Sequence, residues 1–168
     1  MTGMSDSRNT EKRSDKSPRT AVVIVDHGSR RSESNDLLLE VVAAYRAASD
    51  WAIVEPAHME LAEPSLKQAF ASCVAQGASR LIVFPYFLSP GRHWDEDIPR
   101  LAAEAASACG GVEHIVTAPL GLHPLMMQII DERIAHCLRQ ATAGGAPCDV
   151  CAPETGCQLL APDAEAPS

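Results

Sequence analysis

The sequence predicts an α/β domain, a doubly wound parallel sheet of four to five strands with helices on both faces. Three observations support this fold class. Short apolar runs alternate with longer segments of helical period between residues 21 and 143. The first run is rich in β-branched residues, which is typical of a buried central strand. Successive β-then-α units connect parallel strands by right-handed crossovers, and this places helices on both faces of the sheet.

The first β-α unit has the clearest pattern. Its predicted strand is Ala21–Val25, and Ser32 or Ser34 is positioned to cap the helix that follows. The helical period then predicts one apolar face, made of Leu37, Leu38, Val41, Tyr45 and Ala48.

The second unit begins with a predicted strand over residues 51–60. Pro56 interrupts this strand, which favours a position at a sheet edge or a bulge. Pro64 suits the first turn of the next helix, which is predicted to end at Gly77.

Two further units complete the predicted domain. Arg80–Phe84 is the third strand, and an alanine-rich helix over residues 95–109 follows it. The fourth strand, residues 113–118, has a weaker β pattern than the others. The apolar face of a fourth helix consists of Leu125, Met126, Ile129, Ile130, Ile134 and Leu138.

The β-to-α loops carry the residues with the greatest chemical capacity. Because the carboxyl ends of parallel strands meet at one edge of a sheet, we expect these loops to converge where ligands bind. His27 follows the first strand, and Glu60 and Glu63 follow the second. His93 lies in the loop after the third strand, and His123, whose role stays open, lies after the fourth. Two imidazoles at this edge could bind a metal ion, accept protons, or do both.

Four segments together resemble a known family. They are Val25–Arg30 (VDHGSR), Met59–Ser65 (MELAEPS), Pro85–His93 (PYFLSPGRH) and Asp97–Pro99 (DIP). These segments look like those of the short sirohydrochlorin chelatases, and the resemblance covers about residues 20–140. That family is similar in fold to the bilobal ferrochelatases and cobaltochelatases, but supplies one lobe per chain. The resemblance implies a homodimer that inserts a divalent metal into the tetrapyrrole sirohydrochlorin.

By this resemblance, His27 and His93 are the catalytic pair that binds the metal and accepts protons, and Glu60 is the acidic residue beside them. The implied reaction inserts Fe(II) into sirohydrochlorin to give sirohaem, with two protons released. Insertion of Co(II) on the cobalamin route is the alternative, because imidazole and carboxylate sites accept iron, cobalt and nickel alike. An alternative of another class is a non-catalytic iron–sulfur or metal-carrier protein.

The residue types also suit this chemistry. Free imidazole has a pKa of about 6.5, so it can be neutral at working pH, bind a metal ion and still accept a proton. Sirohydrochlorin is a polycarboxylate, and guanidinium groups bind carboxylates well. We therefore expect Arg30, Arg31 and Arg92 to hold the substrate, with Ser29 and Tyr86 as further contacts from the same loops.

Each candidate also has a purely structural interpretation. His27 alone could be a surface residue, and His93 could cap the helix that follows it. Glu63 precedes a proline and fits a helix start better than chemistry. Arg30 and Arg31 could be solvated charges, although cations there oppose the dipole of the predicted helix. That opposition supports an anionic ligand.

The residues after 143 form a Cys-rich tail. Cys148, Cys151 and Cys157 have the spacing Cys-x2-Cys-x5-Cys, which favours zinc or an iron–sulfur cluster. Three thiols fall short of the usual four ligands, so Cys137 or a second chain would have to supply another. The tail resembles the ends of plant-type sirohydrochlorin ferrochelatases, which implies an iron–sulfur cluster. The alternative is a disordered tail, residues 144–168, with reactive thiols.

Net charge and hydropathy limit the classes of partner and the cellular location that the sequence predicts. The net charge is −8, from 14 basic and 22 acidic residues, which argues against a nucleic-acid partner. No apolar stretch approaches the roughly 20 residues that span a bilayer. Residues 1–20 mix basic and acidic side chains, which is typical of a disordered arm rather than a targeting peptide. We therefore expect a cytoplasmic protein, and the family resemblance implies that its domain over residues 21–143 is a chelatase domain.

Overall fold

The computed structural model describes residues 19–143, 148 and 150, which fall into two units. The first unit ends at Gly121 and contains the sheet, and the second begins at Leu122. The predicted arm, residues 1–20, lies outside the described residues apart from Arg19 and Thr20. The predicted tail, residues 144–168, also lies outside them apart from Cys148 and Val150.

The sheet has four strands, all parallel, in the order β2-β1-β3-β4. These are β1 (Thr20–Asp26), β2 (Val54–His58), β3 (Arg80–Pro85) and β4 (Glu113–Val116). β1 is central, which explains why every residue from Ala21 to Val25 is buried. Pro56 lies in β2 at the sheet edge, as its ring predicts. The predicted α/β class is confirmed, and the four strands found among the described residues lie within the predicted four to five.

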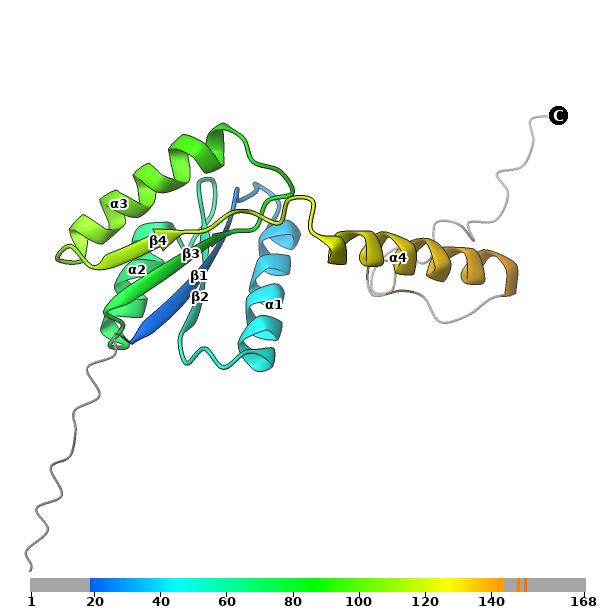
Figure 1. Ribbon diagram of the computed structural model, residues 1–168, viewed down its shortest axis with the longest axis horizontal. Coiled ribbons are helices and arrows are strands. Elements are labelled where there is room, and N and C mark those ends of the chain that lie inside the picture. The colour runs from blue at the N-terminus through cyan, green and yellow to red at the C-terminus, as the bar shows by residue number, and fades with distance from the viewer. Residues whose placement is uncertain (1–18, 144–147, 149, 151–168) are drawn as a thin grey trace, which may run out of the picture. The chain divides into compact units, whose positions relative to one another are not determined.

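Helices cover both faces of this sheet (Figure 1). They are α1 (Ser32–Ala48), α2 (Leu66–Ala75) and α3 (Ile98–Ala108), the last preceded by the π-helical turn η1 (His93–Asp97). Leu38 and Val42 of α1 pack with Val22 and Ile24 on one face. On the other face, α2 and α3 pack against each other and against the remaining side chains of β1. Phe70 of α2 is fully buried there.

Three predicted element boundaries were wrong, each for a local reason. Neither Ser32 nor Ser34 caps α1, because the helix already begins at Ser32 after the N-cap residue Arg31. Pro64 precedes α2 rather than opening it, since Ser65 is the N-cap and its N–H bonds Gln68 Oε1 at 2.7 Å. The helix after β3 begins with the π-turn that contains His93, not at residue 95.

The second unit contains α4 (Pro124–Ala143), which confirms the predicted fourth helix as an element. His123 serves the start of this helix, because its Nδ1 accepts the N–H of Leu125 at 3.3 Å. That contact favours the structural interpretation of His123. Within the described part of the chain, no helix has both the length and the apolar character that a membrane crossing requires.

Candidate active site

The loops that leave β1 and β2 are joined through their backbones. Asp26 O accepts the N–H of Met59 at 2.8 Å, and His27 O accepts the N–H of Glu60 at 3.1 Å. Gly28 lies at the closest approach, with a φ of +81°. A Cβ atom there would be 1.9 Å from Glu60 O, so no other residue fits without moving one loop. The local fold thus fixes His27 beside Glu60.

His27 has an oxygen near each ring nitrogen. Its Nε2 lies 3.1 Å from Glu60 Oε1, and its Nδ1 lies 3.1 Å from Gly28 O. A doubly protonated ring could therefore donate a hydrogen bond from each side. The side chains of His27 and Glu60 are 41% and 54% exposed, so solvent or a substrate can reach both.

His93 comes from the loop after β3 and is the first residue of the π-turn η1. Such single π-turns occur often at functional sites. Trp94 anchors the turn to the end of β4, because its Nε1 donates to Thr117 O at 2.8 Å. His93 Nδ1 lies 2.8 Å from Asp97 Oδ2, one turn further on. Its Nε2 has no hydrogen-bond partner among the residues that the structure describes.

Asp97 is a carboxylate that orients His93. The hydrogen bond from His93 lowers the pKa of Asp97, and the charges of His93, Arg92 and Arg100 act in the same direction against partial desolvation. Asp97 therefore stays ionised and accepts the Nδ1 proton of His93. This contact leaves Nε2 of the ring as the nitrogen available to a metal ion, as in carboxylate–histidine–metal arrangements.

The two imidazoles meet at this edge of the sheet. The ring centroids of His27 and His93 are 5.0 Å apart, and the ring planes cross at 73°. The structure thus brings together His27, His93 and Glu60, as expected from the carboxyl ends of parallel strands. Among the described residues, no group of three or more His, Cys, Asp or Glu side chains is arranged to hold a metal ion. Two imidazoles leave most coordination positions of a bound cation to water or to a substrate.

The predicted cationic residues are all exposed. Arg92 Nε pairs with Glu96 Oε2 at 3.3 Å, one helical turn away. Arg30 and Arg31 form no ion pair with the described part of the chain. Ser29 Oγ accepts the N–H of Arg31 at 3.1 Å, so this hydroxyl helps to shape the loop. The sheet edge therefore offers guanidinium groups that are open to an anion.

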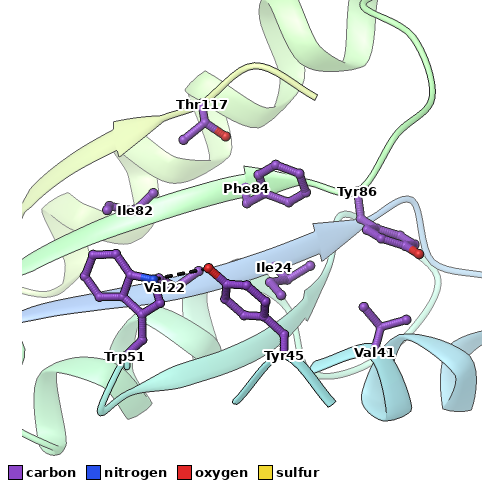
Figure 2. Close-up of a pocket in the computed structure, with 9 residues that line it drawn as sticks. All are labelled: Val22, Ile24, Val41, Tyr45, Trp51, Ile82, Phe84, Tyr86 and Thr117. Carbon is purple, nitrogen blue, oxygen red and sulfur yellow. Dashed lines mark hydrogen bonds between the residues drawn. The ribbon is translucent and has the colours of Figure 1, made fainter. Parts of the chain in front are cut away.

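Tyr86 lies in an apolar groove on the α1 face of the sheet (Figure 2). The groove has a volume of about 370 Å³ and is also lined by Val22, Ile24, Val41, Tyr45, Trp51, Ile82, Phe84 and Thr117. Trp51 Nε1 donates to the Tyr45 hydroxyl at 3.1 Å across it. Tyr86 thus lines an apolar groove and directly follows the last residue of β3.

Other predicted residues have structural roles or lie elsewhere. Glu63 Oε2 accepts the N–H of Ser65, the N-cap residue of α2, at 2.9 Å, and this contact favours the structural interpretation of Glu63. Cys148 is half-buried in the second unit. Cys151 and Cys157 lie outside the described residues.

Sequence reasoning missed two carboxylates at this edge. Asp97 was an orienting partner that the four-residue spacing from His93 could have indicated. Asp26 binds His58, and the predicted strands did not indicate this contact, because the predicted first strand ended at Val25 and the second continued to residue 60.

A family model described as CbiX matches residues 21–137. The chain belongs to the CbiX family. It is 51% identical over 138 residues to the chloroplastic sirohydrochlorin ferrochelatase of Arabidopsis thaliana, which covers 82% of this chain and 61% of the relative. It is also 40% identical over 81 residues to the sirohydrochlorin cobaltochelatase of Methanococcus maripaludis, which covers 48% of this chain and 56% of that relative.

A solved structure supports the same assignment. The sirohydrochlorin chelatase SirB from Bacillus subtilis subspecies spizizenii, in complex with cobalt, matches this CbiX-family chain with a TM-score of 0.66 and 27% identity. The match covers 70% of this chain and 50% of that one. The chain thus spans less than two thirds of the length of each of these proteins. The resemblance to chelatases, and the fold that it implied, are confirmed.

Proposed function

We propose that this CbiX-family chain is a sirohydrochlorin ferrochelatase, a metal chelatase that inserts Fe(II) into sirohydrochlorin to give sirohaem. The meeting of the His27 and His93 rings at 5.0 Å carries the proposal. A carrier that stores metal needs a site that retains its ion, whereas two exposed imidazoles fit an ion that is passed on, and the turnover test below distinguishes insertion from delivery. Fe(II) is then a substrate rather than a resident cofactor.

The two imidazoles exchange one metal ion for two protons. His93 presents Nε2 to the ion, while Asp97 holds the opposite nitrogen. His27 can bind the same ion once Glu60, which is exposed, turns away from its Nε2. As the ion moves into the macrocycle, two pyrrole N–H groups each lose a proton. The imidazoles that released the metal are then free to accept these protons.

Glu60 accepts the proton that His27 takes from the substrate and transfers it to solvent. Protonated His27 can donate to Glu60 Oε1 at 3.1 Å and to Gly28 O at 3.1 Å. Because Glu60 is 54% exposed, its carboxylate can pass the proton to solvent. In this proposal Arg30, Arg31 and Arg92 bind the substrate carboxylates. Ser29 and Tyr86 are further substrate contacts from the loops after β1 and β3.

The Glu60→Gln variant is expected to lower the rate of insertion about tenfold, because the amide cannot accept a proton from His27. Stopped-flow absorbance of the tetrapyrrole measures this rate. Glu63→Gln is the matched control, since it lies in the same loop and its amide oxygen can still accept the N–H of Ser65. Equal rates for both variants and the wild type would exclude Glu60 from proton transfer.

The choice of metal follows from the relatives. The ferrochelatase from A. thaliana is 51% identical to this chain, whereas the cobaltochelatase from M. maripaludis is 40% identical to it. This difference favours iron, and the cobaltochelatase match keeps Co(II) insertion as the second candidate. Anaerobic turnover with Fe(II), Co(II) or Ni(II), followed by tetrapyrrole absorbance, tests both. A carrier would bind metal but would not accelerate insertion with any of the three.

A homodimer would complete the site, because a single sheet edge encloses little of a flat macrocycle. Twofold dimers are the commonest closed assembly, so we expect two facing edges. Light scattering at assay concentration should give twice the chain mass of 17.9 kDa. A monomer with full activity at that concentration would contradict this assembly.

The proposal also includes a metal or iron–sulfur site on the Cys-rich tail and a location in the cell. Cys148, Cys151 and Cys157 are thiol ligands suited to an iron–sulfur cluster, with zinc as the alternative metal. A half-buried thiol on α4, Cys137, is a candidate for the missing ligand. The cytoplasmic location stays a prediction, since the relative from A. thaliana is described as chloroplastic.

A further inference from the structure

The β1 loop is supported by side chains that the proposed chemistry does not use. Asp26 and His58 are register partners at the carboxyl ends of β1 and β2. Strand alternation places both on the face of Ile24, which packs toward α1. His58 is only 1% exposed, and its Nδ1 lies 2.6 Å from Asp26 Oδ1. The contact is part-buried, and Asp26 is the residue that precedes His27 in the chain.

The same carboxylate oxygen holds the turn. Asp26 Oδ1 accepts the N–H of Gly28 at 2.9 Å as well as the Nδ1 proton of His58. The tautomer follows from this partner, since a carboxylate can only accept. His58 Nε2 is buried with no hydrogen-bond partner in the part of the chain that the structure describes. A phenylalanine ring would fill the position without that cost, so packing alone does not account for an imidazole.

Asn35 supports the next residue of the loop. From the first turn of α1, its Oδ1 accepts the N–H of Ser29 at 2.9 Å, and its Nδ2 donates to Ser29 O at 2.9 Å. The backbone on the carboxyl side of His27 is therefore held at two successive residues. The Gly28 N–H is bound by the Asp26 carboxylate, and the Ser29 N–H is bound by the Asn35 side-chain amide oxygen.

We propose that Asp26, His58 and Asn35 form a clamp that fixes the backbone after His27 and so holds the His27 ring against His93. These three are positioning residues, since none of them needs to touch the metal or the tetrapyrrole. The inference rests on the proposed function. His27 must be preorganised because the ion and two protons are exchanged within one short contact, and small displacements of such groups slow reactions steeply.

Two substitutions at His58 test the clamp. His58→Phe keeps the ring volume and removes the hydrogen bond, whereas His58→Asn can still donate from its amide. In His58→Phe we expect kcat for metal insertion to fall about tenfold or more, with KM for sirohydrochlorin nearly unchanged. His58→Asn should recover most of kcat. His114→Phe is the matched control, a half-buried strand histidine whose ring makes an edge-to-face contact with Phe70.

Amide hydrogen exchange, read by NMR, tests the clamp independently of activity. The Gly28 amide should exchange about tenfold faster in His58→Phe than in the wild type, because its acceptor loses its orientation. In Asn35→Ala the Ser29 amide should do the same. This second variant lies at a half-buried helix start and serves if His58→Phe does not fold.

The outcomes separate the clamp from the function. Unchanged Gly28 and Ser29 exchange would overturn the clamp, whatever the activity. Faster exchange with unchanged kcat would overturn the positioning role, and so would equal losses of kcat in His58→Phe and His58→Asn. If the wild type inserts no metal, the proposed function fails, while faster exchange in the variants still supports the clamp itself.

Discussion

Replacing His27 or His93 by alanine is expected to lower the rate of Fe(II) insertion at least about a hundredfold. Each change removes both a ligand of the incoming ion and a proton acceptor, and general acid–base catalysis alone contributes about 10²–10⁴-fold. Because the two imidazoles act as one unit, the double variant should be little slower than either single variant. Initial rates of the tetrapyrrole absorbance change, measured anaerobically, give these ratios.

The loss must arise from chemistry and not from unfolding. The side chains of His27 and His93 are 41% and 51% exposed, and such surface positions usually contribute little to stability. Both variants should therefore keep the circular dichroism spectrum of the wild type. His114→Ala supplies the control, a strand histidine outside the site. Turnover close to normal in a folded His27→Ala or His93→Ala protein would refute the assignment.

The Gly28→Ala variant should lose both stability and activity. An alanine Cβ would lie 1.9 Å from Glu60 O, and the φ of +81° is unfavourable for any L side chain. Backbone strain of this kind costs about 1–3 kcal/mol, and relief of the clash must separate the two loops. Because these loops carry His27 and Glu60, we expect a lower melting temperature and an insertion rate that is at least about tenfold lower. Displacing catalytic groups by about 1 Å can lower a rate by about 10²-fold.

Gly91→Ala is the matched control for this change. Gly91 lies in the loop that carries His93, and a Cβ there would meet nothing within 4 Å. Its melting temperature and rate should stay close to those of the wild type. If Gly28→Ala behaved like Gly91→Ala in thermal unfolding and turnover, the two loops would not be packed as closely as the structure places them.

The sequence predicted those features that depend on local pattern or on sheet geometry. Ala21–Val25 is apolar throughout because a central strand is buried on both faces, and this run was recognised directly. The meeting of His27 and His93 followed from one rule, that parallel strands end at the same edge. Both predictions needed only the order of strands and helices along the chain.

Features that depend on register or loop geometry could not be predicted in this way. The Asp26–His58 contact needs the alignment of β1 with β2, which no local pattern specifies. The four-residue spacing could have indicated the Asp97–His93 contact, but the predicted helix start at residue 95 left His93 outside the helix. Arg31 is the N-cap of α1 because the loop before it is already held by Ser29 and Asn35, so a serine cap was unnecessary.

The central claim is that one metal ion lies between His27 and His93 before it enters the macrocycle. X-ray absorption at the cobalt edge, with one equivalent of Co(II) and no tetrapyrrole, counts imidazole ligands directly. The account predicts two imidazoles in the wild type, one in either single alanine variant and none in the double variant. A wild-type spectrum with oxygen ligands only, or one that does not change in His27→Ala and His93→Ala, would contradict it.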